Sequence, residues 1–195
     1  GCKYICGIDE VGRGPLAGPV VAAAVILKKD SYFEGLNDSK KLSEKKREEL
    51  YDKITNEAIA YAICEVNNEE IEKYNIYNAA RIAMQRAVEK LDVKPDFLLI
   101  DAMPFENYPI PNYSMVKGDE KSVSIAAASV IAKVYRDNLM KKYASKYPYY
   151  DFENNAGYGT KKHLEGLRKY GITPIHRRDF EPIKSMIKRG GNDGQ

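Results

Sequence analysis

Four carboxylates stand where the sequence predicts strands to end or a helix to begin. Asp9 and Glu10 follow a short apolar run, and Asp101 follows four consecutive apolar residues. Because reactive groups in open α/β sheets gather at the carboxyl ends of strands, we expect these acids to lie near one another. Asp119 precedes a long helical pattern, where it would either complete a group of four acids or simply cap the helix.

Four carboxylates gathered in one place would repel one another strongly. Two unit charges ~4 Å apart repel by about 4 kcal/mol at an effective dielectric constant of about 20. Bound cations would offset this repulsion, and an all-oxygen ligand set favours Mg²⁺ or Mn²⁺ over zinc. Two such ions on shared carboxylates would suit in-line hydrolysis of a phosphodiester. The alternative is that Asp9 and Glu10 are ordinary solvated residues.

The loop after the first acidic pair is rich in glycine. It runs Gly12-Arg13-Gly14-Pro15 and continues to Gly18 and Pro19. The absence of side chains lets a ligand's backbone come close, and Arg13 places one guanidinium between two glycines. The loop therefore predicts a contact with phosphate or sugar, unless it is only a turn.

Two groups of basic residues add to this interpretation. Lys40 and Lys41 stand in the polar turn 37–41, and six basic residues lie between positions 161 and 178 with only Glu165 against them: Lys161, Lys162, Arg168, Lys169, Arg177 and Arg178. Both groups are either phosphate contacts or solvated surface residues. The net charge of +3 is too small to identify a partner by itself.

Strands alternate with helices along the chain, which indicates an α/β fold. Strands are predicted at 4–9, 20–27, 59–66, 97–100 and 113–116, the first two pairing as a hairpin. Helices are predicted after a cap at Ser43, at 71–74, 76–91 and 122–143, and from about residue 161 to Tyr170. No core signal is recognised in 172–189.

Length and composition are those of a globular protein of 195 residues, with 44% hydrophobic and 30% charged residues. We expect a catalytic core at 1–145, a helical segment packed on it at 146–189 and a disordered tail at 190–195. The three cysteines form no C-x-x-C pair, and two histidines cannot complete a zinc site with them. Neither a secretion signal nor a membrane span is recognised, so a cytoplasmic location with reduced thiols is expected. We also expect a monomer.

Several motifs, taken in order, are similar to those of ribonuclease HII, the prokaryotic type 2 ribonuclease H. The resemblance covers about residues 7–180 and rests on these segments: Gly7-Ile8-Asp9-Glu10-Val11-Gly12-Arg13-Gly14-Pro15, Asp38-Ser39-Lys40-Lys41-Leu42, Ile100-Asp101, Lys117-Gly118-Asp119-Glu120-Lys121, the helix 125–133, Gly157-Tyr158-Gly159-Thr160 and His176-Arg177-Arg178.

The resemblance implies an RNase H-like fold with a mixed five-stranded sheet and a C-terminal helical segment. It implies cleavage of RNA in RNA–DNA hybrids, and incision 5′ of a ribonucleotide embedded in duplex DNA, leaving 3′-hydroxyl and 5′-phosphate ends. The family's metal-binding acids match Asp9, Glu10, Asp101 and Asp119. Residues matching its substrate contacts include the ribonucleotide-reading loop and the sugar-packing tyrosine: Gly12, Arg13, Gly14, Ser39, Lys40, Lys41, Tyr158, Lys161 and Arg177.

Two other interpretations compete with this one. Ribonuclease HIII, the sister family, carries Gly-Lys-Gly in the loop and an extra N-terminal domain, so Arg13 and the early first strand argue against it. A non-catalytic nucleic-acid-binding module with a structural or Ca²⁺-binding acidic cluster would explain the basic residues, but not the placement of the acids. Tyr158 alone would otherwise be an ordinary surface tyrosine. No clamp-binding motif is recognised in the last residues, so recruitment by a replication clamp is not expected.

Overall fold

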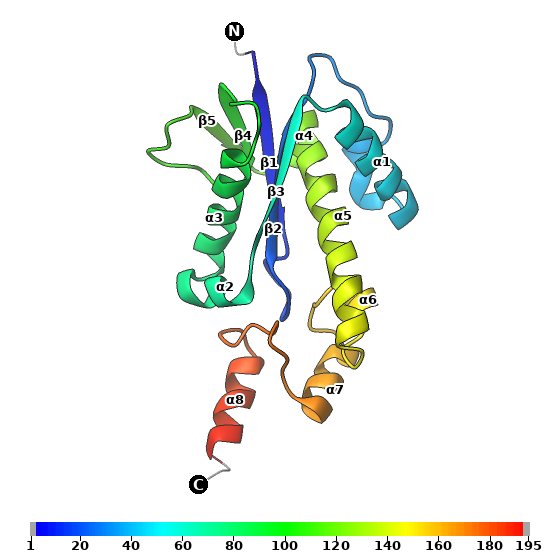
Figure 1. Ribbon diagram of the computed structural model, residues 1–195, viewed down its shortest axis with the longest axis vertical. Helices are drawn as coiled ribbons and strands as arrows, with labels where there is room; N and C mark the ends of the chain where they lie inside the picture. Colours follow the sequence, from blue (N-terminus) through cyan, green and yellow to red (C-terminus); the bar gives the residue numbers. More distant parts are fainter. Residues whose placement is uncertain (1–2, 193–195) are drawn as a thin grey trace. The chain divides into compact units, whose positions relative to one another are not determined.

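The computed structural model describes residues 3–192 and contains a five-stranded mixed sheet (Figure 1). The strand order is β3-β2-β1-β4-β5, with β1 antiparallel to β2 and parallel to β4, and β4 parallel to β5. The strand bounds are β1 Ile5–Val11, β2 Val20–Ile26, β3 Ala60–Val66, β4 Phe97–Asp101 and β5 Asn112–Met115. The α/β class, the mixed sheet and the predicted hairpin are confirmed.

The first strand is longer than predicted. Asp9 and Glu10 do not follow β1 but lie inside it, because the strand continues to Val11 and pairs with β2 as far as Val21. Asp101 is the last residue of β4, as predicted.

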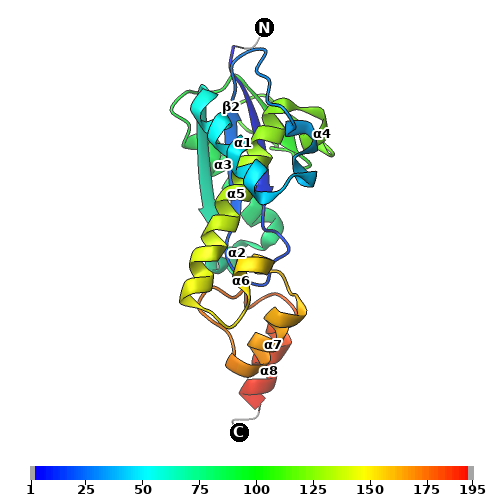
Figure 2. The same cartoon turned by 90° about the vertical axis from the view of Figure 1, so that its right-hand side faces the viewer.

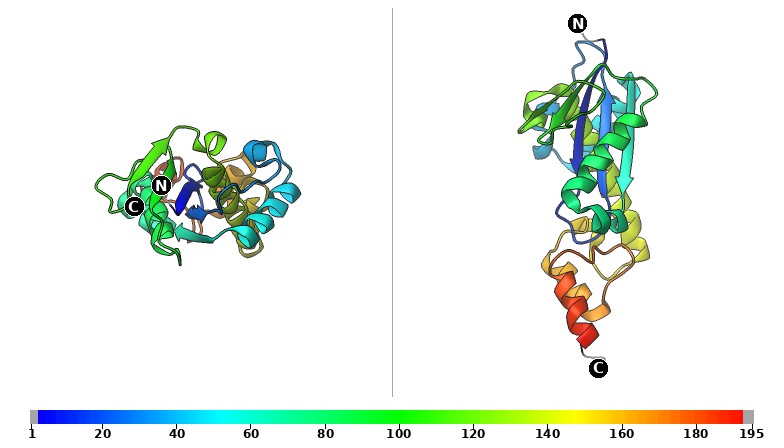
Figure 3. Two further views of the ribbon diagram at one scale, coloured as in Figure 1. Left: turned by 90° about the horizontal axis from the view of Figure 1, so that it is seen from above. Right: turned by 90° about the vertical axis from the view of Figure 1, so that its left-hand side faces the viewer.

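Helices cover both faces of the sheet. Helices α1 and α5 lie on one side and α3 on the other (Figures 1 and 3), and Figure 2 looks onto the α1 side. The helices of this part of the chain are α1 Glu44–Glu57, α3 Ile76–Glu89, the short α4 Gly118–Lys121 and α5 Val123–Lys146; a 3₁₀ helix spans Leu36–Lys41. Ser43 caps α1 by accepting a hydrogen bond from the amide of Lys46, as expected.

Small side chains let α5 approach the sheet closely. Ala126, Ala127 and Ala128 are buried in one hydrophobic cluster with β2 and α1. On β1, a Cβ atom placed on Gly7 would lie 2.1 Å from the backbone carbon of Ser124, so only glycine fits there. The backbone of α5 thus packs directly on the backbone of β1, the strand that carries two of the acids, and fixes its position.

The chain forms two compact units. The first contains the sheet and consists of residues 1–11, 21–65 and 80–135; the second consists of 12–20, 66–79 and 136–195. The glycine loop therefore groups with the C-terminal residues, whereas the sequence suggested a linear division at residue 145. Among residues 3–192, no helix is long and apolar enough to cross a membrane.

The second unit has its own apolar core. It includes α2 Asn68–Tyr74, α6 Phe152–Asn155, α7 Lys161–Tyr170 and α8 Ile183–Asn192. Ile183 is fully buried with Phe152 and Leu167. The sequence showed no core signal here, so α8 was missed, and the expected tail is helical as far as Asn192; its last three residues lie outside the described part.

Candidate active site

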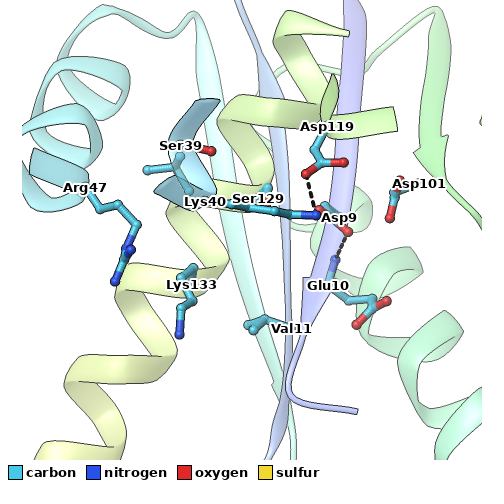
Figure 4. Close-up of a pocket in the computed structure, with 11 residues that line it drawn as sticks. Asp9, Glu10, Val11, Ser39, Lys40, Arg47, Asp101, Asp119, Ser129 and Lys133 are labelled. Carbon is cyan, nitrogen blue, oxygen red and sulfur yellow. Dashed lines mark hydrogen bonds and ion pairs between the residues drawn. The ribbon is translucent and has the colours of Figure 1, made fainter. Parts of the chain in front are cut away.

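The four predicted acids line one pocket in the first unit (Figure 4). The pocket has a volume of about 300 Å³ and is open to solvent on one side. Asp9 and Glu10 come from β1, Asp101 from the end of β4, and Asp119 from α4. Asp9 and Asp119 are buried, while Glu10 and Asp101 are half-buried. The sequence therefore identified a group that the fold brings together.

Asp9 is the electrostatic centre of the pocket. Burial raises its pKa well above the ordinary value, and the charges of Asp101, Glu10 and Asp119 raise it further. Its Oδ1 atom accepts one hydrogen bond from the amide of Glu10 at 2.7 Å, which opposes the effect only in part. A carboxylate held charged in this setting needs a cation.

A short backbone contact holds Asp101 in place. Asp101 accepts a hydrogen bond from the amide of Gly118 at 2.7 Å, which links β4 to α4. Asp119 does not cap the long helix: Ser122 accepts the bond from the amide of Ile125 at the start of α5. The alternative of Asp119 as a simple cap is therefore wrong.

The donor set fits a hard divalent cation, because all four side chains offer carboxylate oxygens and crowding disfavours the charged state of Asp9. Within residues 3–192, no three His, Cys, Asp or Glu side chains already stand close enough together to form a metal-binding group. The four acids thus face one pocket, but their carboxylates lie further apart than the ligands of a bound ion. Ion binding would have to bring them closer together.

Basic residues also reach this pocket. Lys40 pairs with Asp119, with 2.9 Å between Nζ and Oδ2 (Figure 4), and the hydrogen bond to Asp119 raises the pKa of Lys40. Ser39 is buried beside it and Lys41 is exposed. Arg47 of α1 and Lys133 of α5 also line the pocket, although neither was predicted as a site residue from the sequence. Lys133 is the last residue of the helical segment 125–133, one of the segments on which the resemblance rests, but that resemblance assigned it no role.

The second unit presents the predicted sugar-binding residues. Arg13, Gly14 and Tyr158 are exposed, whereas Gly12 is buried. A Cβ atom on Gly14 would lie 3.2 Å from Cε1 of Tyr158, so this tyrosine ring stands directly against the loop. Arg13 lies over the ring of Tyr77, with its guanidinium carbon 6.0 Å from the ring centroid.

The basic block 161–178 divides into exposed and buried residues. Lys161, Lys162, Arg168, Lys169 and Arg178 are exposed. Arg177 is fully buried, and its guanidinium donates to the carbonyls of Gly12, Arg13 and Gly18 at 2.6, 3.0 and 3.0 Å. The interpretation of Arg177 as a surface residue that contacts the substrate directly therefore has to be corrected, because its donors face the protein's own loop.

Two buried histidines form a hydrogen-bonded chain that ends at the backbone carbonyl of Tyr158. The amide of Thr173 donates to Nδ1 of His176, so the proton of His176 is on Nε2 and is donated to Nε2 of His163 at 2.9 Å. His163 must then carry its proton on Nδ1, where it donates to the carbonyl of Tyr158 at 2.9 Å. Both rings are therefore neutral.

This pair predicts a loss of stability in mild acid. Burial and the neighbouring His163 lower the pKa of His176 to about 3, and burial lowers that of His163. The unfolded chain takes up these protons below about pH 6.5, so the free energy of unfolding falls as the pH drops from 6.5 towards 3, by up to about 1.4 kcal/mol per pH unit for His176. His163 adds to the loss in the same direction. We expect His176→Gln to flatten the dependence of Tm on pH between 7.5 and 5.5; an unchanged slope would contradict this.

Comparison with known proteins identifies many relatives. The family model described as Ribonuclease HII matches residues 6–183. The chain is 62% identical to the ribonuclease HII of Macrococcus caseolyticus over 190 residues, covering 97% of this chain and 71% of that protein. It is 60% identical to the ribonuclease HII of Enterococcus faecalis, covering 96% of this chain and 73% of that one.

Solved structures agree with these sequence matches. The crystal structure of the ribonuclease H2 from Pyrococcus horikoshii superposes with a TM-score of 0.82 at 27% identity, covering 95% of this chain and 98% of that one. Ribonuclease HII in the PCNA:RNase HII complex from Archaeoglobus fulgidus gives a TM-score of 0.77 at 25% identity, covering 91% of this chain and 95% of that one. The agreement extends over nearly the whole chain, including both compact units.

Proposed function

Because the chain belongs to the ribonuclease HII family, and is thus a metal-dependent endonuclease acting on the RNA of RNA–DNA hybrids, we propose that it also incises duplex DNA 5′ of single embedded ribonucleotides. The products would carry 3′-hydroxyl and 5′-phosphate ends. We also propose that the protein acts as a monomer in the cytoplasm. PCNA is the partner of the ribonuclease HII from Archaeoglobus fulgidus. We do not propose that a clamp protein recruits the present chain.

The observation that carries this proposal is the approach of Tyr158 to Gly14 in the second unit. Tyr158 is 44% exposed and its ring stands against the loop at a position where a larger residue would push it away. An exposed aromatic ring beside a glycine gives a flat surface for a sugar and access to nearby backbone donors. This combination suits recognition of one ribose more than general binding to phosphates.

We propose that Asp9, Glu10, Asp101 and Asp119 hold two divalent cations, Mg²⁺ or Mn²⁺. When bound, such ions supply an activated water and stabilise the leaving oxygen. The acids themselves orient the ions, and their crowding around Asp9 supports cation binding at neutral pH. Lys40, Lys41 and the exposed basic residues that include Lys161 would bind phosphates, with Ser39 beside them.

The experiment that tests this function uses a labelled duplex with one ribonucleotide. We expect a single nick at the 5′ side of the ribonucleotide with Mg²⁺ or Mn²⁺, and none in chelator or on an all-deoxy duplex. A long RNA–DNA hybrid serves as the control for general activity. Cleavage of the hybrid with no nick at the single ribonucleotide would contradict the proposal.

Lys40 gives a separate prediction about metal binding. Its ammonium already neutralises Asp119 in the absence of metal, so it competes with a bound cation. We expect Lys40→Gln to bind Mn²⁺ more tightly, by up to about fivefold, because an ion pair whose lysine is largely exposed is worth at most about 1 kcal/mol. Substrate affinity should fall. Calorimetric titration with Mn²⁺ measures this, with exposed Lys53→Gln on α1 as the matched control. Weaker Mn²⁺ binding by Lys40→Gln would contradict the competition.

A further inference from the structure

The glycine loop is held by two buried guanidinium groups of the second unit. Arg177 binds the carbonyls of Gly12, Arg13 and Gly18. Arg136 of α5 binds those of Ala17, Pro19 and Ala156 at 2.6–3.0 Å. Both arginines are at most 1% exposed. Five of these six hydrogen bonds thus go to carbonyl groups of one short loop.

Both guanidiniums stay charged at neutral pH in spite of their burial. Burial lowers the pKa of Arg136 to about 10, and burial together with the charge of Arg136 lowers that of Arg177 to about 9. Placing two like charges inside one small unit is unfavourable unless their hydrogen bonds are made. The loop carbonyls supply those bonds, so the loop and the arginines fix each other's positions.

The direction of the carbonyls decides the direction of the amides. In a trans peptide the C=O and the following N–H point to opposite sides. The carbonyls of Gly12 and Arg13 point inward to Arg177, so the amide groups of Arg13 and Gly14 face away from it. Arg13 and Gly14 are exposed, and Tyr158 stands beside Gly14. The inward bonds therefore present two adjacent N–H donors on the side open to ligand.

We propose that Arg177 is a positioning residue for ribonucleotide specificity: by binding the carbonyls of Gly12 and Arg13, it aims the amides of Arg13 and Gly14 at the 2′-hydroxyl of the ribose. This inference rests on the proposed incision at single ribonucleotides. Arg177 acts through the loop and does not touch the substrate. Arg136 holds the far end of the loop and does not bind the two carbonyls that set these amides.

A binding experiment separates this role from general support of the fold. Arg177→Lys is made in the Asp9→Asn background, and affinities are measured by fluorescence anisotropy for a duplex with one ribonucleotide and for the same duplex in all-deoxy form. We expect Arg177→Lys to lose about tenfold of the preference for the ribonucleotide, with the all-deoxy affinity unchanged. Equal weakening on both duplexes would overturn the proposal, because simple destabilisation lowers both affinities together.

Two control variants keep the outcome interpretable. Arg189→Lys makes the same chemical change at an exposed site on α8, and Ile183→Val removes a buried methylene from the core of the second unit. Both should keep the ribonucleotide preference. If the Asp9→Asn protein with Arg177 intact shows no preference at all, and the wild type makes no nick, then the proposed function itself fails.

A second measurement does not depend on the folding of any Arg177 variant. In the Asp9→Asn protein, amide NMR signals are followed while either duplex is added. We expect the amides of Arg13 and Gly14 to shift with the ribonucleotide duplex and to shift less with the all-deoxy duplex. Identical responses to the two duplexes would overturn the proposal.

Discussion

Asp9→Asn is expected to lower the cleavage rate by at least about a thousandfold while leaving the protein folded. The substitution removes one metal-binding oxygen and the most buried negative charge of the pocket. Cleavage of an RNA–DNA hybrid at saturating Mg²⁺ measures the loss. The exposed Asp52→Asn on α1 is the matched control and should cleave normally. Near-normal turnover by Asp9→Asn would show that the acids of this pocket are not the metal ligands.

The same variant should be more stable than the wild type when metal is removed. Burial and three neighbouring carboxylates raise the pKa of Asp9 in the folded protein, so its stabilising contribution is present below about pH 3.8 and is lost as the pH rises through the raised pKa. A pKa difference of one unit corresponds to about 1.4 kcal/mol.

At pH 7 in chelator we therefore expect Asp9→Asn to have the larger free energy of unfolding and a higher Tm, by about 2–4 °C for each kcal/mol gained. The gain should shrink towards pH 4, where the wild-type carboxyl group is protonated. Thermal unfolding at the two pH values measures the difference. A wild type that is more stable than Asp9→Asn in chelator at pH 7 would contradict the electrostatic account.

The acidic pocket was predictable because local sequence carries its signal. An acid after an apolar run is visible without any tertiary information, and two such places marked the pair Asp9 and Glu10 and the single residue Asp101. The position of the strand end was not predictable, because β1 is extended to Val11 by pairing with β2. The pairing of β1 with β2 thus places Asp9 and Glu10 inside the strand instead of after it. The acids that line the pocket are nevertheless the predicted ones.

The buried cations of the second unit were not predictable in the same way. Arg177 lies in a run of basic residues, and charge runs normally indicate a solvated surface. Its burial depends on carbonyl groups more than 150 positions away in the chain. Arg136 lies among the polar residues of a long helix, so nothing in the sequence marks it as buried. Helix α8 was not predicted because its apolar face finds a partner only in the folded unit. Long-range pairing, and not local propensity, decides these positions.

Gly12 and Gly14 of the loop should respond differently to substitution by alanine, although the sequence alone assigns them one role. Gly12 has a φ of +90°, and its Cβ would lie 2.3 Å from Nε of the buried Arg136 and 2.9 Å from the carbonyl oxygen of Pro19. The conformation is strained for alanine and the neighbours are fixed. We therefore expect Gly12→Ala to cost about 3 kcal/mol or more of unfolding free energy and to lower all activities together.

Gly14→Ala should instead fold normally and lose specificity. Its Cβ would meet only the edge of Tyr158, at 3.2 Å, and an exposed ring can move by a few tenths of an ångström. Movement of the ring and the added methyl group would both hinder the ribose. We expect kcat/KM to fall about tenfold or more on a duplex with one ribonucleotide, and less on a long hybrid, where neighbouring positions can also be cleaved.

The comparison between the two variants decides what the loop does. Arg13→Lys, which keeps the charge and the glycines, should be milder than either. If Gly14→Ala loses both activities in equal proportion at unchanged Tm, the loop acts only as a support for the strand that carries Asp9 and Glu10. If the loss is confined to the single ribonucleotide, the loop reads the sugar, because a hydroxyl group that fails to meet its donors costs far more than a charge displaced in solvent.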